Sequence, residues 1–418
     1  MRFLFIHPNF PGQFRHLSTS LARQPGNMVV GLGENDPLVR QRGSTPGVQL
    51  RGYILKPDTA SPGMHHYLNQ QQACVMHGLA VLKECLAMRK LGFEPDVIVA
   101  HPGWGGTLFL RQIYPAVPIV GYFEFYYHAQ GKDLGFDPEF PVSLDNRCEV
   151  HMKNATQLLA LTDCDSYWSP TLWQANLFPA CYRERMQVIH DGIDTEQLRP
   201  DPDACFTLPG GQRISLDDEV LTLVTRNMEP YRGFHIFMRA LPEIQKRRPK
   251  AITVIVGSES EHPYGNSPTP DARGNPRTWK QVLLEEVGSR LDLSRVHFTG
   301  MLPYDQYVRV LQVSRAHVYM TYPHVLSWSL LESMASGCLV IASNTPPVAE
   351  VIRDRYNGLL FDFFDGAALT VLAEEALANP RKFMDIRDNA RQSVVQHYDL
   401  HTVSLPRQMT LIEEARRT

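Results

Sequence analysis

The stretch Val220–Gly233, VLTLVTRNMEPYRG, indicates how the chain folds. It opens with apolar and β-branched residues, a run that is typical of a buried strand. A polar turn with Pro230 and Gly233 follows, and residues 233–248 then repeat apolar side chains at helical spacing. A strand that passes through a tight turn into a helix is half of a βαβ unit, so this stretch predicts a parallel sheet.

The same alternation runs through both halves of the chain. In the first half, the runs that predict strands are Arg2–Ile6, Met28–Gly31, Val48–Leu55, Val97–Ala100, Ile119–Phe123, Leu158–Leu161 and Val188–His190. In the second half they are Val220–Thr225, Ile252–Gly257, Val296–Thr299, Ala316–Met320, Leu339–Ser343 and Gly358–Phe361. Amphipathic stretches long enough for helices separate these runs, so we expect an α/β protein with two doubly wound, Rossmann-like domains.

A segment rich in Pro and Gly, Leu198–Gln212, separates the two sets of strands and indicates a domain boundary. We predict an N-terminal domain over residues 1–199 and a C-terminal domain over residues 200–399. A last helix, over residues 400–418, is expected to pack back on the first domain. Because parallel sheets bind ligands at the carboxyl ends of their strands, two facing sheets predict a central cleft as the ligand site.

The composition excludes several classes of protein. The 418 residues are 43% hydrophobic and 20% charged, which is ordinary for a globular protein and unlike a disordered or fibrous one. The net charge of −3 gives no global reason to bind nucleic acid. The 7 cysteines form no Cys-x-x-Cys pair, and no apolar run is long enough for a signal peptide or membrane span. We therefore expect a cytoplasmic protein.

Two arginines in the opening stretch are suited to a phosphate ligand. Arg226 is expected at the end of a strand and Arg232 just before a helix. Two fixed cations beside a helix N-terminus bind a diphosphate well, through charge-assisted hydrogen bonds and the helix dipole. The residues alone allow an equally good interpretation, in which both are surface arginines and one pairs with Glu229.

A second segment, Tyr322–Gly337, carries hydroxyls at a predicted helix start. Ser327 is suited to an N-cap, and Ser329 lies in the first turn. Glu332, slightly more than one turn into the helix, can accept hydrogen bonds from both hydroxyls of a ribose. On these residues alone, a helix-start carboxylate favoured by the dipole is the preferred interpretation of Glu332.

In this order, the two segments resemble the sugar-nucleotide site of the retaining family 4 glycosyltransferases with the GT-B fold. Four further pieces carry the resemblance: Val188–Asp194, Val254–Gly257, Val296–Gly300 and Ser343–Glu350. The resemblance runs from Met1 to about Tyr398. It implies a nucleoside-diphosphate sugar as a substrate, an acceptor-binding N-terminal domain, and no metal or cofactor.

The resemblance implies roles for individual residues. Arg226 and Arg232 correspond to the cations that bind the donor diphosphate, although the family usually has lysine at position 232. Glu332 corresponds to the second glutamate of the E-x7-E motif, the ribose ligand, whereas His324 stands where the first glutamate is expected. This departure leaves the donor sugar open. The other donor-site residues that the resemblance implies are Gly12, Gln13, Met301, Leu302, Ser327, Trp328, Ser329 and Glu350.

The N-terminal half shows a similar exchange at Glu124, which stands where the family usually has a histidine near the reacting sugar. A carboxylate there can stabilise oxocarbenium charge or act as a nucleophile, so Glu124, Arg226, Arg232 and His324 are the candidate catalytic residues. The alternatives are a strand-end glutamate paired with a surface arginine, or His128 in place of Glu124. Candidate acceptor contacts are His101, Trp104 and Tyr126.

Two further features of the sequence bear on metal binding and on substrate contact. Asp163-Cys-Asp165 matches the Asp-x-Asp metal motif of the other main glycosyltransferase fold, but that fold has one nucleotide-binding sheet, so a metal role is rejected here. The polar loop Ser258–Arg277 is either a substrate-contacting lid or an inert insertion.

The sequence thus predicts a metal-independent, retaining glycosyltransferase that moves a sugar to a hydroxyl of a saccharide, lipid-linked or small-molecule acceptor. A lipid-linked acceptor would imply peripheral contact with the cytoplasmic face of a membrane. The alternatives are a sugar-nucleotide epimerase or hydrolase of the same fold, and a catalytically inactive sugar-nucleotide binder.

Overall fold

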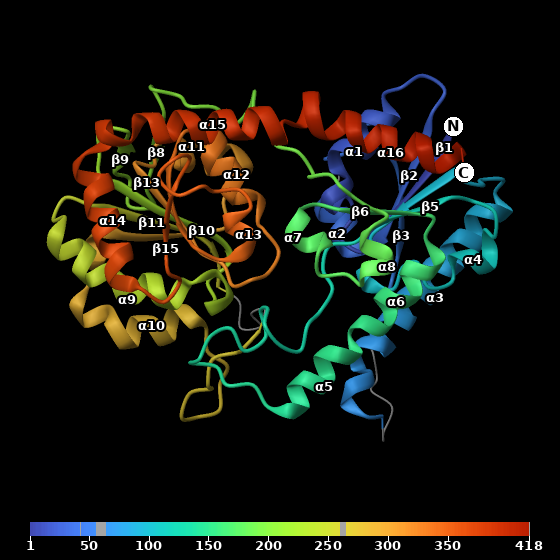
Figure 1. Cartoon of the computed structure of the whole chain (residues 1–418), viewed down its shortest axis with the longest axis horizontal. Helices are drawn as coiled ribbons and strands as arrows, with labels where there is room; N and C mark the ends of the chain where they lie inside the picture. The colour runs from blue at the N-terminus through green and yellow to red at the C-terminus, as the bar shows by residue number, and fades with distance from the viewer. Residues whose placement is uncertain (42, 56–63, 260–264, 418) are drawn as a thin grey trace. The chain divides into compact units, whose positions relative to one another are not determined.

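The computed structural model describes residues 1–41, 43–55, 64–259 and 265–417 (Figure 1). The chain forms two compact units. Unit 1 comprises Met1–Gly135, Pro141–Gly192 and Leu400–Thr418, and unit 2 comprises Phe136–Phe140 and Ile193–Asp399. Unit 2 therefore includes a short segment from the first half of the chain, and the last residues of the chain belong to unit 1. The return of the last residues to the first unit agrees with the sequence analysis, whereas the 136–140 segment in unit 2 was not predicted and unit 1 gives way to unit 2 at Gly192/Ile193, not at residue 199.

Unit 1 is built on a parallel sheet with the strand order β3-β2-β1-β4-β5-β6-β7. The strands are β1 (Arg2–Ile6), β2 (Met28–Glu34), β3 (Gln49–Tyr53), β4 (Val97–Ala100), β5 (Ile119–Tyr122), β6 (Ser166–Ser169) and β7 (Met186–Val188). The helices are α1 (Arg15–Ala22), α2 (Asn35–Arg40), α3 (Asn69–Lys90), α4 (Leu110–Ile113), α5 (Leu144–Met152), α6 (Asn154–Asp163), α7 (Leu172–Ala175), α8 (Ala180–Arg183) and α16 (Leu405–Arg417).

Apolar residues on alternate positions of the central strands form the core of unit 1. Phe3 and Phe5 of β1 pack in one cluster with Leu17 of α1 and with Leu411 and Ile412 of α16. All five side chains are buried. The C-terminal helix therefore completes the core of this unit, because it covers a sheet face that would otherwise lie in water.

Unit 2 has a second parallel sheet, with the order β12-β11-β10-β13-β14-β15, and a two-stranded antiparallel sheet, β8-β9. The strands are β8 (Cys205–Thr207), β9 (Arg213–Ser215), β10 (Val220–Asn227), β11 (Ile252–Ser258), β12 (Val296–Gly300), β13 (Ala316–Tyr319), β14 (Leu339–Ser343) and β15 (Leu359–Phe361). The helices are α9 (Phe234–Arg247), α10 (Trp279–Val287), α11 (Tyr304–Gln312), α12 (Trp328–Ala335), α13 (Pro346–Ala349), α14 (Gly366–Ala378) and α15 (Met384–Tyr398).

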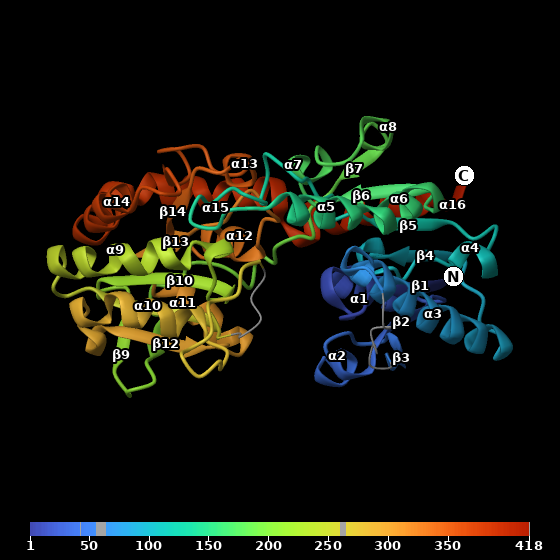
Figure 2. The ribbon, with the colours of Figure 1, turned by 90° about the horizontal axis from the view of Figure 1, so that it is seen from below.

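Helices cover both faces of the unit 2 sheet, as Figures 1 and 2 show. Leu221 and Leu223 of β10 face one cluster, to which α9, α10 and α14 contribute. Val340 and Ala342 of β14 face another, with residues of α11, α12 and α15. This doubly covered parallel sheet confirms the predicted Rossmann-like architecture. Among the described residues, no helix is both long and apolar enough to cross a bilayer.

One predicted strand is wrong. Leu158–Leu161 lies within helix α6, because Ala and Leu are strong helix formers and Leu158 and Leu159 remain exposed on it. The strand at this place is β6, whose short SYWS sequence gives little apolar signal although Trp168 is fully buried. The predicted linker Leu198–Gln212 also contains structure. Its Pro-Gly-Gly turn closes the β8-β9 hairpin, with Gly211 at φ 86°.

The strand order reverses beside the first strand of each sheet. β1 lies between β2 and β4 in unit 1, and β10 lies between β11 and β13 in unit 2. The segments that follow these neighbouring strands separate to opposite faces and leave the strand ends accessible, which is where such sheets bind ligands. In unit 2, the chain leaves β10 through a turn that ends at Gly233, with φ 66°.

Substitution of Gly233 can test how tightly this turn is packed. A Cβ at this position would lie 2.4 Å from Cβ of Met320, and the positive φ is strained for other residues. Gly211 also has a positive φ but no atom within 4 Å of a built Cβ, so it serves as the control. We expect Gly211→Ala to lower the free energy of unfolding by about 1–2 kcal/mol and Gly233→Ala to lower it by more. Urea denaturation of the full-length variants measures both, and equal losses would contradict this packing.

Candidate functional site

Arg232 organises the carboxyl edge of the unit 2 sheet. It ends the short 3-10 turn Pro230–Arg232 that leads into α9. Its Nη1 donates to Oγ1 of Thr321 at 2.9 Å and to the carbonyl oxygen of Val325 at 3.1 Å. These bonds join the end of β10 to the loop after β13, which we call the 321–325 loop. The second predicted cation, Arg226, lies exposed near the end of β10.

The 321–325 loop leads into α12, whose first turn carries the predicted hydroxyls. Ser327 is the N-cap, with φ −78° and ψ 143°, and its hydroxyl oxygen lies 3.0 Å from that of Ser329. The backbone N–H of Ser327 donates to the Tyr319 hydroxyl at 2.9 Å. The N-terminus of a helix of this kind favours an anionic ligand.

His324 is buried in the same loop, with 8% of its surface exposed. Burial and the nearby positive charge of Arg232 hold its pKa well below the ordinary value, so the imidazole is neutral at pH 7. Its ring makes an edge contact with Tyr231, with centroids 5.6 Å apart. A neutral imidazole offers one donor and one acceptor, which suits a sugar hydroxyl but supplies no carboxylate charge.

Two tyrosines, which the sequence analysis missed, hold Glu332. The hydroxyl of Tyr307 donates to Oε2 at 2.6 Å, and that of Tyr304 donates to Oε1 at 3.1 Å. Burial raises the pKa of Glu332, and the two phenol hydrogen bonds oppose that rise. Both tyrosines come from one face of α11, and their i, i+3 spacing was the available signal.

The remaining predicted donor residues lie at nearby elements of unit 2. Met301 follows β12 and is 65% exposed, which leaves it accessible to a ligand. Leu302 packs partly against the cluster beside β11. Trp328 is partly exposed in the first turn of α12, and Glu350 lies exposed at the end of α13. Part of the loop predicted at 258–277, residues 260–264, lies outside the described residues.

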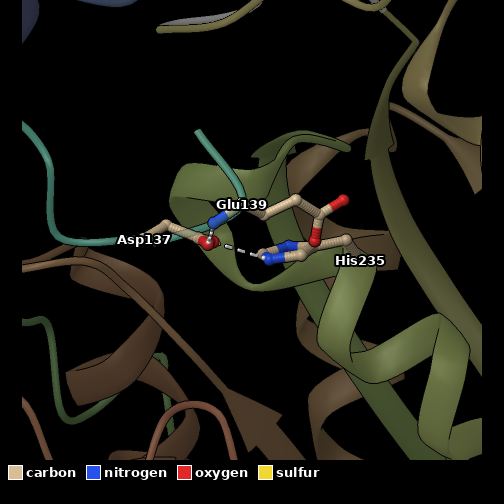
Figure 3. A group of neighbouring side chains, drawn as sticks. All are labelled: Asp137, Glu139 and His235. Atoms are coloured by element: carbon tan, nitrogen blue, oxygen red, sulfur yellow. Dashed lines mark hydrogen bonds and ion pairs between the residues drawn. The ribbon is translucent and has the colours of Figure 1, made fainter. Parts of the chain in front are cut away.

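A buried polar cluster in unit 2 had no sequence signal (Figure 3). Asp137 Oδ2 accepts from Nε2 of His235 at 2.9 Å and from the hydroxyl of Tyr322 at 2.6 Å. Burial would raise the pKa of Asp137, but the hydrogen bonds from His235 and Tyr322 lower it below the ordinary value. The ligand atoms of Asp137, Glu139 and His235 lie within 4.8 Å of one another, close enough for a metal ion. Arg239, however, donates to both oxygens of Glu139, at 2.6 and 2.9 Å, so a salt bridge already uses that carboxylate.

In unit 1, Glu124 lies just beyond β5 and accepts two hydrogen bonds. Nε2 of Gln13 donates to Oε1 at 2.9 Å, and Nε2 of His101 lies 3.4 Å from Oε2. Burial would raise the pKa of Glu124, but the hydrogen bond and charge of His101 lower it, so the group is a carboxylate at neutral pH. Its side chain is 31% exposed, whereas that of His101 is 5% exposed, so a ligand can reach the carboxylate.

His7, at the end of a third strand, also belongs to the cluster around Glu124. It was not among the predicted site residues. His7 follows β1, and its ring contacts that of His101 at a centroid distance of 5.2 Å. Burial, followed by the nearby His101, lowers the pKa of His7 to about 3. A Cβ on Gly12 would lie 2.7 Å from Nε2 of His7, so only glycine lets the loop cross this imidazole. The signal was a histidine directly after an apolar strand, as at His101.

The other residues predicted in unit 1 differ in their exposure and in their contacts. Trp104 is 44% exposed beyond β4. Tyr126 packs between His128 and Phe178, at centroid distances of 5.9 and 5.4 Å. His128 bonds to the carbonyl oxygen of Leu177 at 2.8 Å and takes no part in the Glu124 cluster. In the rejected Asp-x-Asp pattern, Asp165 pairs with Arg111.

The two sheets, each with polar residues at the carboxyl ends of its central strands, define the two-domain GT-B class of α/β proteins. Within it, the chain belongs to the family 4 glycosyltransferases. A model described as "Glycosyl transferase family 4 group" matches residues 26–198, and one described as "Glycosyl transferases group 1" matches residues 212–393.

Two curated relatives match part of the chain. A GDP-mannose-dependent alpha-(1-6)-phosphatidylinositol monomannoside mannosyltransferase from Mycolicibacterium smegmatis is 26% identical over 201 residues, which are 46% of this chain and 47% of that protein. A D-inositol 3-phosphate glycosyltransferase from Streptomyces coelicolor is 22% identical over 208 residues, 47% of this chain and 43% of that protein. The matched region thus spans about half the length of these two proteins.

Solved structures match nearly the whole chain. Sucrose-phosphate synthase from Thermosynechococcus elongatus superposes with a TM-score of 0.75 at 15% identity and covers 100% of both chains. HepE from Anabaena, solved in complex with UDP and glucose, superposes with a TM-score of 0.64 at 15% identity and covers 98% of this chain and 99% of that one. At this identity the likeness shows the fold.

The hydrogen bonds from Tyr304 and Tyr307 to Glu332 predict that nucleotide affinity depends on pH. Tyr307→Phe removes one donor from a buried carboxylate whose pKa burial already raises, so the pKa of Glu332 rises further. If ionised Glu332 binds ribose, affinity for a nucleoside diphosphate is lost as the pH falls through this pKa, and the variant loses it at a higher pH than the wild type. Calorimetric titrations of UDP and GDP between about pH 5 and 8 measure the shift. Tyr304→Phe, which removes the longer hydrogen bond, should shift the curve less; coincident curves for all three proteins would contradict the assignment.

Proposed function

We propose that this protein is a retaining glycosyltransferase that moves a sugar from a nucleoside-diphosphate sugar to a hydroxyl of a saccharide, lipid-linked or small-molecule acceptor. The observation that carries the proposal is the arrangement at the edge of the unit 2 sheet. There Arg232 joins the β10 turn to the 321–325 loop, which leads directly into the N-terminus of α12. A fixed guanidinium beside the positive end of a helix dipole suits a diphosphate.

In the proposed reaction, the acceptor oxygen attacks the anomeric carbon while the bond from that carbon to the diphosphate oxygen breaks. Arg226, Arg232 and the helix end stabilise the negative charge on the leaving diphosphate, which makes a metal ion unnecessary. The acceptor proton passes to an oxygen of the departing diphosphate on the same face of the sugar, so no separate base is required. Glu332 holds the ribose, and His324 binds a hydroxyl of the donor sugar.

Glu124 is proposed to stabilise positive charge on the transferred sugar. Gln13 and His101 fix its oxygens, and its lowered pKa keeps it ionised at neutral pH. A carboxylate held in this way is preorganised, so its negative charge stabilises the positive charge of an oxocarbenium-like transition state. His7 and His101 support it, His101 by direct contact and His7 through its packing on His101.

The similar proteins support a nucleoside-diphosphate sugar as the donor, but they do not agree on its nucleobase. One is named for GDP-mannose and another was solved with UDP and glucose. Thermal-shift measurements with UDP-, GDP-, ADP- and dTDP-sugars identify the donor, because a ligand that binds only the folded state stabilises it. Transfer to a panel of acceptors, with the anomeric configuration of the product read by NMR, then tests the reaction. Inverted product excludes retention. Epimerised donor without acceptor, rapid donor cleavage, or binding without any product would replace the proposal with an epimerase, a hydrolase or an inactive binder.

The two cations give a direct test of the diphosphate site. We expect Arg226→Ala and Arg232→Ala each to lower kcat/KM by about 100-fold or more, because each removes charge stabilisation from the leaving group. Arg232→Lys is the matched control, since it keeps the charge but removes the guanidinium, whose Nη1 bonds to Thr321 and Val325. Near-normal turnover in both alanine variants would remove the assignment.

Glu124→Gln keeps the shape of the side chain and removes its charge. We expect kcat to fall on the order of 100-fold while donor affinity changes little, because the charge acts mainly in the transition state. Steady-state kinetics together with donor titration separate the two quantities. An unchanged kcat would reject the role of Glu124 at the sugar.

A further inference from the structure

The segment Phe136–Phe140 is built into unit 2, although the chain before and after it belongs to unit 1. Two aromatic residues pack it in place. Phe136 contacts Tyr322 and Phe363 at centroid distances of 5.1 and 5.3 Å, and Phe140 contacts Trp279 at 5.5 Å. The segment is therefore a packed part of unit 2, and we call it the 136–140 anchor.

Within the anchor, Asp137 has donors on both carboxylate oxygens. The backbone N–H of Glu139 donates to Oδ1 at 2.9 Å, while His235 and Tyr322 share Oδ2 at 2.9 and 2.6 Å. Asp137 and Tyr322 are 4% and 2% exposed, and His235 is fully buried. Figure 3 shows Asp137 directed from the anchor toward His235 on α9. A buried carboxylate with three donors fixes each of them, because any donor that loses it is left without water as a substitute.

Tyr322 connects this carboxylate to the proposed donor site. Its backbone N–H donates to the carbonyl oxygen of Tyr231 at 3.0 Å, and its own carbonyl oxygen accepts from the N–H of His324 at 2.6 Å. The Tyr231 ring lies between the two, 4.5 Å from the ring of Tyr322 and 5.6 Å from that of His324. The position of the His324 imidazole is thus set through Tyr322.

We propose that Asp137 is a positioning residue for the donor sugar: it holds Tyr322, and through Tyr322 it fixes His324 and the 321–325 loop. This inference rests on the proposed function, in which His324 binds the sugar. Asp137 comes from the first half of the chain but lies in unit 2, which holds the proposed donor site. It is outside the segments that resemble the family's sugar-nucleotide motifs.

Two variants test the proposal, with a matched control two residues away. Asp137→Asn puts an amide where one of the two accepting oxygens stands, so at least one of the three donors faces another donor. Tyr322→Phe removes a single hydroxyl and is the milder change. Glu139→Gln alters the same anchor at a side chain that pairs with the partly exposed Arg239 and gives Asp137 no side-chain hydrogen bond, so it controls for general loosening of the segment.

We expect Asp137→Asn and Tyr322→Phe to lower kcat by about tenfold or more, because a displaced sugar contact misaligns the reacting atoms. Affinity for the free nucleoside diphosphate should fall less than kcat, because the side chains of Arg226, Arg232 and Glu332 are themselves unchanged. Glu139→Gln should stay within about twofold of the wild type in both quantities. The double variant should be no slower than the slower single one, because both changes break the same link.

Amide hydrogen exchange of the full-length protein gives a readout that does not need turnover. Peptides that cover residues 321–327 should exchange faster in Asp137→Asn and Tyr322→Phe than in the wild type or Glu139→Gln. If exchange there is unchanged in both variants, or if kcat falls equally in the control, the positioning role is overturned. If the wild type transfers no sugar at all, the proposed function fails, and the exchange experiment still decides whether Asp137 holds the loop.

Discussion

Parallel strands all end at the same edge of a sheet, and this constraint brings together the functional candidates that follow the strands. In unit 1, His7, His101 and Glu124 follow three neighbouring strands, and therefore meet although they are far apart in the sequence. In unit 2, Arg232 and Thr321 follow the two strands on either side of the order reversal and form a hydrogen bond. Elsewhere on each sheet, helices cover the faces and leave little room for a polar ligand.

The chemistry of the two sheet edges differs. The unit 2 edge carries the cations Arg226 and Arg232 and the start of α12, and tyrosines hold its buried carboxylate Glu332. At the unit 1 edge, the carboxylate of Glu124 is bonded to Gln13 and His101. An anionic ligand group suits the first edge and a developing positive charge suits the second. This division matches the two charges that form when a sugar separates from a diphosphate.

The sequence predicted most of the fold because apolar strand periods and Gly- or Pro-marked turns are local signals. It failed where the local signal was weak, as at β6, or misleading, as in the Leu-rich helix α6. The candidate residues next to strand ends, such as Glu124 and Arg232, could be chosen from the pattern and the family resemblance. Asp137 could not, because a short acidic segment does not reveal the distant histidine and tyrosine that bury it. Tyr304 and Tyr307 were equally hidden, since their role depends on which helix face meets Glu332.

The place of helix α16 in the core of unit 1 affects the order in which the two units can fold during synthesis. Its residues Leu411, Ile412 and Ala415 belong to the core of unit 1, whose first strand, β1, lies far before α16 in the chain and is synthesised before it. Unit 2 has all of its residues once Asp399 has been added, whereas unit 1 still lacks helix α16 at that point. The half made first is therefore finished last, and until then its nascent sheet exposes an apolar face that chaperones or premature partners can bind.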